Sequence, residues 1–203
     1  MSELHSDALA TLRSWSAPDA DQEGLRRRYV SHLEAHPDGM QRSCRPDHLT
    51  ASTLVISADR RQVLLTLHAK AERWFQLGGH CEPDDRRLVD AATREAREES
   101  GLPGLVLDPV PLQLSEHEVP FCRSPAGIDP DTPDAPDARV VHHLDVRFLA
   151  VVAADAVPAV SEESLDVRWW PTGALPDPEP GLLDLVRLAR ARLAVSPGTP
   201  GAD

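Results

Sequence analysis

The residues best suited to chemistry are three glutamates close together in the chain. Glu95, Glu98 and Glu99 are spaced i, i+3 and i+4, so on a helix their carboxylates share one face. Like charges on one face repel, and Arg94 and Arg97 offset this only in part. Such a face is commonly just solvated. Three converging carboxylates also suit Mg²⁺, which prefers oxygen ligands.

A glycine-rich segment precedes these glutamates. Gly78 and Gly79 are followed by His80, and glycine lets backbone groups approach a ligand closely. A glycine bend beside three carboxylates favours a metal site over a solvated acidic face.

The run from Gly79 to Leu102 resembles the motif of the Nudix hydrolase family. That motif reads Gly, five residues, Glu, seven residues, Arg-Glu, an aliphatic, any residue, Glu-Glu, any residue, Gly and an aliphatic. Residues 94–102 match its second half closely. Two features depart from it: Asp85 stands where the family has Glu, and the stretch 86–93 has one residue more than the family. We expect the extra residue in the loop before the helix, where it leaves the carboxylate spacing unchanged.

The resemblance implies Mg²⁺-dependent hydrolysis of a diphosphate linkage in a nucleoside diphosphate joined to another moiety. It implies metal ligation by Glu95, Glu98, Glu99 and the carbonyl of Gly79, with Mg²⁺ as cofactor and Mn²⁺ as a substitute. Catalytic roles fall to Glu95, Glu98 and Arg94. The arginine is expected to hold the cluster by pairing with the acidic residue early in the motif or with a helix carboxylate. Bound Mg²⁺ neutralises phosphate charge and lowers the pKa of coordinated water.

The general base is left open by the resemblance. Some family members use the counterpart of Glu95, and others use a carboxylate on a loop outside the motif. The outside candidates in this chain are Glu116, Glu162 and Glu163.

Candidate substrate contacts are His80, His143 and Glu163. His80 follows the glycine pair directly, and alternation along a strand places His142 and His143 on opposite faces, so that one of them can face a cleft. We expect the partner to be a small-molecule nucleotide or nucleoside diphosphate derivative. A formal net charge of −12 disfavours a broad contact with nucleic acid or an anionic membrane. A homodimer is an open alternative, since many relatives dimerise.

Hydrophobic periodicity and turn residues predict the elements that position these groups. Two helices are expected within residues 3–36, with Ser6 as a candidate cap of the first. The motif helix is expected at 87–100, ended by Gly101. Strands and a closing amphipathic helix complete the pattern, with strands expected at 49–56, 63–68, 74–77, 140–152 and 166–170, one or two strands at 105–119, and the helix at 181–195.

This order does not alternate as a parallel doubly wound sheet would, so it predicts a fold in the α/β or α+β range. The resemblance implies an α/β/α sandwich around a mixed β-sheet, with an N-terminal helical extension and a C-terminal helix. We expect an extension at 1–45, a Nudix hydrolase domain at 46–177, and a helix and tail at 178–203. Residues 122–139, rich in Pro, Asp, Ala and Gly, are expected to form an excursion without a packed core.

Three cysteines, Cys44, Cys81 and Cys122, lie far apart and form no CxxC pair. A disulfide framework or a cysteine zinc site is therefore not expected. No apolar run is long enough to span a bilayer. The first residues lack a basic region followed by an apolar one, so no signal peptide is expected and the predicted location is the cytoplasm.

Two other functions fit this fold. A non-catalytic Nudix-like nucleotide-binding module would have lost helix carboxylates, and Glu95, Glu98 and Glu99 are all present. An isoprenoid-diphosphate isomerase would need a reactive cysteine with a partner glutamate, for which Cys81 near the motif is the nearest candidate.

Overall fold

The computed structural model describes residues 2–119, 141–160 and 164–195. The expectations for residues 122–139, for Cys122 and for Glu162 and Glu163 lie outside these ranges. Within them the chain forms, in order, α1 (Glu3–Ser14), α2 (Ala20–Ala35), β1 (Asp47–Ser57), β2 (Gln62–His68), β3 (Arg73–Phe75), β4 (Leu77–His80), α3 (Leu88–Ser100), β5 (Leu107–Glu118), β6 (His142–Val152), β7 (Ser164–Pro171) and α4 (Pro180–Val195).

The strands form one mixed sheet. Its order is β3-β2-β1-β6-β5, while β4 also pairs with β1 and β7 with β2. The predicted hairpin of β1 and β2 is present and antiparallel. β1 and β6 are parallel, with His48 opposite His143, and the other pairs are antiparallel. The long-range pairing of β1 with β6 brings the segment after residue 140 beside the first strand.

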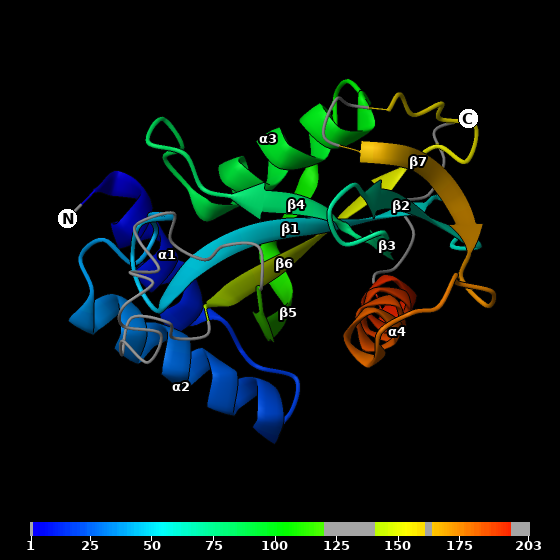
Figure 1. Ribbon diagram of the computed structural model, residues 1–203. Helices are drawn as coiled ribbons and strands as arrows, with labels where there is room; N and C mark the ends of the chain where they lie inside the picture. Colours follow the sequence, from blue (N-terminus) through cyan, green and yellow to red (C-terminus); the bar gives the residue numbers. More distant parts are fainter. Residues whose placement is uncertain (1, 120–140, 161–163, 196–203) are drawn as a thin grey trace.

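Helices cover both faces of the sheet, which makes the α/β/α sandwich (Figure 1). α3 packs on β1 and β4, and α4 packs on the other face against β5 and β1. Alternate residues of β1 divide between two apolar clusters: Leu49, Ala51 and Val55 face α3, whereas Leu54 and Ile56 face α4. The two sides of β1 therefore serve two separate cores.

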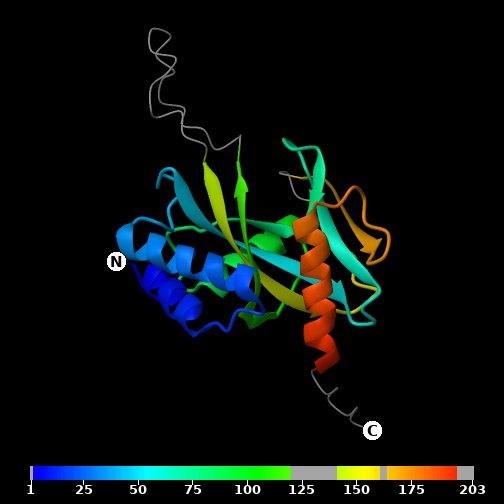
Figure 2. The same ribbon diagram turned by 90° about the horizontal axis from the view of Figure 1, so that it is seen from below.

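The N-terminal helices α1 and α2 lie side by side (Figure 2) and belong to the core on the α3 side. Leu12 and Tyr29 are fully buried there. The predicted cap of α1 was wrong: the helix begins at Glu3, and Ser2 accepts a hydrogen bond from the His5 amide. Ser6 lies inside the helix, where its hydroxyl donates to the Ser2 carbonyl. The residue that caps the helix is therefore Ser2, whose side chain accepts from an amide of the first turn.

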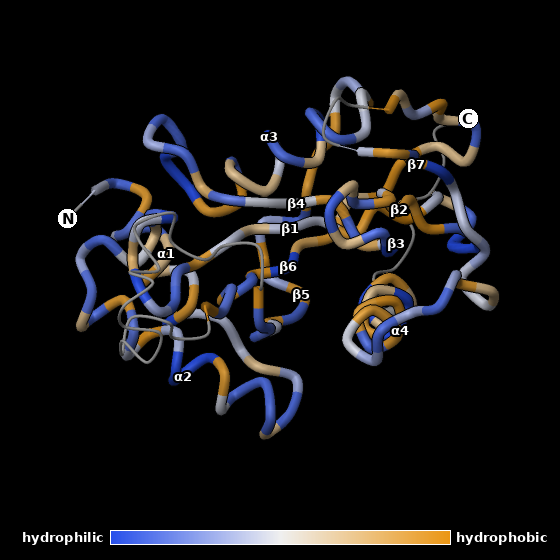
Figure 3. Tube along the Cα trace, in the orientation of Figure 1, coloured by the Kyte–Doolittle hydropathy of each residue, from blue (hydrophilic) through white to orange (hydrophobic). Residues whose placement is uncertain are grey.

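α4 mixes hydrophobic and hydrophilic residues along its length (Figure 3), as expected for an amphipathic helix. It buries Leu182, Leu185 and Ala189 against the sheet. Trp169 and Trp170 of β7 point to opposite faces and pack against the two different cores. No helix in the described ranges is long and apolar enough to cross a bilayer.

Candidate active site

The sequence of α3 explains how closely it approaches the sheet. Leu88, Ala91 and Ala96 are fully buried, and alanine allows the helix backbone to lie near the strands. At its N-terminus, the Leu88 amide donates to the carboxylate of Asp7 in α1 at 2.8 Å. At its C-terminus, Gly101 takes the left-handed conformation with φ 64°, as the predicted glycine stop requires.

Two carboxylates of α3 contact the glycines of β4 directly. The Gly78 amide donates to Oε2 of Glu99 at 2.7 Å. A Cβ added to Gly79 would lie 2.8 Å from Oε2 of Glu95, so no larger residue fits there without moving that carboxylate. Position 79 therefore requires glycine in this structure, and what approaches the strand closely is the side-chain carboxylates of α3.

Arg94 lies at the centre of the carboxylate cluster. Its Nη1 donates to Glu95 and to Glu98, each at 3.0 Å, and its Nη2 donates to the His80 carbonyl at 2.9 Å and to Asp85 at 3.1 Å. Burial lowers the pKa of the guanidinium, but hydrogen bonds and charges from Asp85 and Glu95 outweigh it and raise that pKa above its usual range. The cluster therefore holds a permanent cation.

The expected pairing of Arg94 with Asp85 is present. The Asp85 side chain is 7% exposed, and its Oδ2 also accepts from the Glu82 amide. The segment between Cys81 and Arg87 forms a loop, and α3 begins only at Leu88. A loop of this kind takes up the extra residue of the motif, so the shorter aspartate still reaches the arginine.

The three carboxylates of α3 differ in solvent exposure. Glu99 is 9% exposed and Glu95 15%, whereas the Glu98 side chain is 59% exposed. They offer oxygen donors only, which is the donor set that Mg²⁺ takes in proteins. Among the described residues these three are not a group whose ligand atoms all lie within 4.8 Å of one another, and Nη1 of Arg94 contacts both Glu95 and Glu98. Ligation by all three requires Glu98, the most exposed, to leave Arg94.

His80 and His143 are brought together, and two further histidines join them. His143 is directly opposite His48 of β1 and His117 of β5, while His80 is opposite Thr50 of β1. The ring centroids of His80 and His143 are 4.8 Å apart. By strand alternation these side chains lie on the α4 side of the sheet, across it from the carboxylates of α3.

Of the candidate bases outside the motif, only Glu116 lies in the described ranges. Arg28 of α2 donates to it from Nε at 2.5 Å and from Nη2 at 2.7 Å. Arg28 also bonds Asp47, and Asp47 in turn bonds His142. Glu116 is thus held in a bidentate ion pair that fastens α2 to the sheet.

Cys81 follows the glycine strand, but its thiol is not activated. Burial raises its pKa to about 12, and the charges of Asp85 and Glu95 act in the same direction. A reactive cysteine needs a lowered pKa, so Cys81 does not supply the reactive cysteine that the isomerase interpretation requires.

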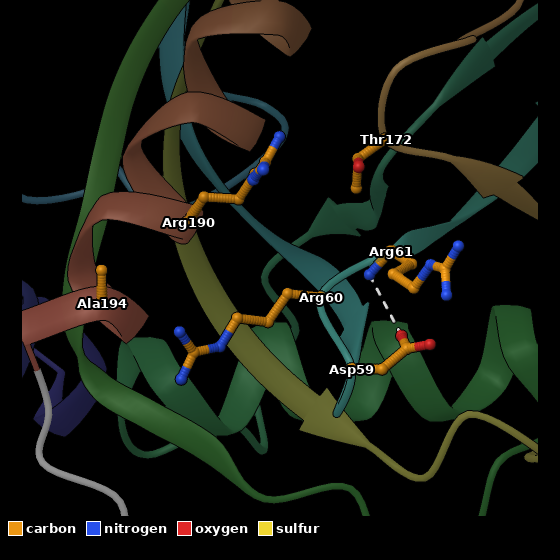
Figure 4. Close-up of a pocket in the computed structure, with 6 residues that line it drawn as sticks. All are labelled: Asp59, Arg60, Arg61, Thr172, Arg190 and Ala194. Atoms are coloured by element: carbon orange, nitrogen blue, oxygen red, sulfur yellow. Dashed lines mark hydrogen bonds between the residues drawn. The ribbon is translucent and has the colours of Figure 1, made fainter.

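A cavity of about 440 Å³ lies beside the turn after β1 and the C-terminal half of α4 (Figure 4). It is lined by Asp59, Arg60, Arg61, Thr172, Arg190 and Ala194. This is the end of β1 opposite to His48, and the lining includes none of the predicted site residues that the structure describes. The cavity is therefore separate from the carboxylate cluster.

His48, His117 and Asp7 were missed by the sequence analysis. A histidine at the start of the first strand was a signal in the case of His48. Nothing local reveals the strand register that joins it to His143, because 95 positions separate the two residues (143 − 48).

Comparisons with known proteins bear on the family and the fold of this chain. The family model of the NUDIX domain matches residues 46–189. An Ap4A hydrolase from C. elegans is similar in structure, with 18% identity, a TM-score of 0.56, and 72% of this chain and 97% of the other covered.

Two further solved structures are similar. The NUDIX domain of NrtR from Shewanella oneidensis, in complex with ADP ribose, has 19% identity and a TM-score of 0.51, with 75% of this chain and 92% of that chain covered. The dihydroneopterin triphosphate pyrophosphohydrolase of E. coli has 16% identity and a TM-score of 0.52, with 70% and 95% covered. No curated protein matches the sequence.

Proposed function

This chain belongs to the Nudix family of phosphoanhydride hydrolases, and we propose that it uses Mg²⁺ to hydrolyse a diphosphate linkage in a nucleoside diphosphate derivative. The main support is the position of Glu95 and Glu99 of α3, which lie directly against Gly78 and Gly79 of β4. A merely solvated acidic face would not be fitted to a glycine strand in this way.

In this proposal Glu98 and Glu99 hold the cation, with the Gly79 carbonyl as a further oxygen ligand. Glu95 completes the ligand set and is our candidate for the base that takes a proton from the attacking water. Bound Mg²⁺, or Mn²⁺ in its place, neutralises phosphate charge and lowers the pKa of water. Arg94 is a positioning residue: its contacts to Glu95 and Glu98 order the cluster while the site is free of substrate.

The substrate class rests on chemistry shared by the similar structures. Their names contain Ap4A, ADP ribose and dihydroneopterin triphosphate, in each of which phosphate groups are linked to a larger organic moiety. We infer a small-molecule nucleotide derivative as the partner of this chain, with His80, His143 and Glu163 as candidate contacts. A net charge of −12 supports a small substrate over nucleic acid.

We further infer that the enzyme acts in the cytoplasm, because Cys44 and Cys81 are free thiols in the described part of the chain. A homodimer remains our proposal for its assembly in solution.

The test is a panel of diphosphate substrates incubated with Mg²⁺, with phosphate release as the readout and a chelator arm for each substrate. Wild-type protein is expected to hydrolyse at least one nucleotide derivative, only when Mg²⁺ is present. We expect Glu98→Gln to lower kcat by about 10²-fold or more, because a carboxylate that holds the charge-neutralising cation is lost.

The matched control is Glu34→Gln. Glu34 lies on a helix, its side chain is 52% exposed, and it pairs with Arg13 at 2.6 Å, much as Glu98 pairs with Arg94. It should leave the rate unchanged. Hydrolysis of nothing on the panel would favour the non-catalytic binding module, and full activity of Glu98→Gln would refute the assignment of α3.

A further inference from the structure

Four histidines from four adjacent strands gather on the α4 side of the sheet. They are His80 of β4, His48 of β1, His143 of β6 and His117 of β5. The ring centroid of His48 lies 5.2 Å from that of His80 and 4.9 Å from that of His143. The ring centroids of His117 and His143 are 5.6 Å apart. The carboxylate cluster of α3 contributes no side chain to this group.

Three of these imidazoles have the spacing of a metal site. One ring nitrogen from each of His48, His80 and His143 lies within 4.8 Å of the other two. Nitrogens that share a tetrahedral Zn²⁺ at about 2.0–2.1 Å are roughly 3.3 Å apart. Side-chain rotations that bring the nitrogens roughly 1–1.5 Å closer together would therefore give the spacing of a metal site. The three strands that carry these residues are already hydrogen-bonded to one another, which fixes their separation.

The ring nitrogens of His48, which lies between His80 and His143, lack a well-formed hydrogen bond. His48 is fully buried, and neither of its ring nitrogens has a hydrogen bond of good geometry, although the Cys44 backbone lies close enough to act on its pKa in the upward direction. Buried polar atoms are nearly always satisfied, so an unpaired imidazole at the centre of a histidine group indicates a missing ligand. A metal ion would supply the partner for one of the two nitrogens.

The charge state favours a cation over an anion. Burial lowers the pKa of His48 to about 4 and that of His143 to about 2, and the neighbouring imidazoles act in the same direction on His143. Neutral imidazole is the form that ligates metals, whereas a phosphate site needs positive charge. The group is therefore poorly suited to bind the phosphates of a substrate.

We propose that His48, His80 and His143 bind a first-row transition-metal ion such as Zn²⁺, at a site separate from the Mg²⁺ ligands of α3. Three nitrogen ligands leave one position for water, with His117 as the next imidazole along the row. The ion cross-links β4, β1 and β6. It thereby braces the strand that carries Gly78 and Gly79, against which the carboxylates pack.

A second group of metal-binding residue types, His36, Asp38 and Cys44, has the same spacing. Asp38 is exposed, and burial raises the pKa of the Cys44 thiol to about 11, which disfavours the thiolate that a metal needs. The histidine group is the better site, and the test separates the two.

The full-length protein, stripped with a chelator, is dialysed against Zn²⁺ in excess Mg²⁺ and its metal content is measured. We expect one tightly held equivalent of Zn²⁺, reduced at least tenfold in affinity by His48→Gln and by His143→Gln. His142→Gln is the matched control, since it lies on the same strand with its side chain on the other face, and Glu98→Gln should also retain Zn²⁺. Circular dichroism checks that each variant folds.

Loading wild-type protein with Co²⁺ gives a readout that depends on no variant. A tetrahedral nitrogen site is expected to give strong visible ligand-field absorption, which an octahedral oxygen site lacks. Weak absorption, absence of Zn²⁺ binding, or binding that Cys44→Ser removes while His48→Gln does not, would each overturn the proposal. Hydrolysis is measured nowhere in this test, so its outcome is independent of the proposed enzymatic function.

Discussion

At the scale of single residues, the spacing of nearby residues predicted which side chains lie together, whereas the register between distant strands could not be predicted. The i, i+3, i+4 pattern of Glu95, Glu98 and Glu99 placed three carboxylates on one helix face, and the structure has them there. The pairing of Arg94 with Asp85 was also expected and is present. His48 could not be assigned to the same cluster as His143, because the parallel pairing of β1 with β6 leaves no local mark in the sequence.

Tyr29 gives a prediction at this scale, because it is the one tyrosine in the chain. Burial raises its pKa well above 10, with the charge of Asp145 adding to the effect. Above pH 10 the unfolded chain loses the phenol proton while the folded chain keeps it, so this residue makes stability fall as pH rises past that value. We expect Tyr29→Phe to reduce this alkaline loss, measured by urea unfolding at about pH 7 and about pH 10.5.

At neutral pH the same variant should be as stable as wild type or more stable. The Tyr29 hydroxyl has no hydrogen-bond partner in the described structure, so its removal costs no bond and ends an unsatisfied burial. Since no other phenol is present, phenolate absorbance reports Tyr29 alone. A loss of more than about 2 kcal/mol at neutral pH, or an ordinary pKa in the folded protein, would contradict this account.

At the scale of elements, α3 was predicted within one residue of its observed start, and its glycine stop was placed correctly. Alanine periodicity and a C-terminal glycine are strong local signals. The start of α1 was misplaced because two serines, Ser2 and Ser6, could each serve as its cap. The contact of α3 with Asp7 of α1 was not foreseeable, because it joins elements 81 positions apart.

The fit of α3 against β4 makes a prediction for Gly79→Ala. The added methyl group would stand 2.8 Å from the Glu95 carboxylate, which is the end of a flexible side chain, so the carboxylate moves and the backbone stays. We expect kcat to fall by about 10²-fold, as misplacement of a reacting group by about 1 Å commonly causes, with little change in the free energy of unfolding. Steady-state kinetics and urea unfolding measure the two effects.

Gly24→Ala is the control for this substitution. Gly24 lies in the middle of α2, and an added methyl group there would meet nothing within 4 Å, so the change should leave kcat alone and stabilise the protein by about 0.5–1 kcal/mol. Wild-type kcat in Gly79→Ala would show that the position of Glu95 does not matter for the reaction.

At the scale of the whole molecule, the mixed sheet between two helical layers follows from the element order and the family resemblance. The relation of the N-terminal helices to that sandwich did not follow from either. The sequence predicts residues 1–45 as an extension, yet Leu12 of α1 and Tyr29 of α2 are buried in the same core as the sheet. Arg28 also ties α2 to Asp47 and Glu116. Helix amphipathicity indicates a buried face but does not identify what covers it.

The central claim is that carboxylates of α3 hold a divalent cation beside the glycine strand. Titration of the intact protein with Mn²⁺, followed by the electron paramagnetic resonance signal of the free ion, measures that directly. We predict that wild type binds Mn²⁺, that Mg²⁺ competes for the site, and that Glu99→Gln weakens binding at least tenfold while Glu34→Gln does not. Equal Mn²⁺ affinity in wild type and Glu99→Gln would contradict the account.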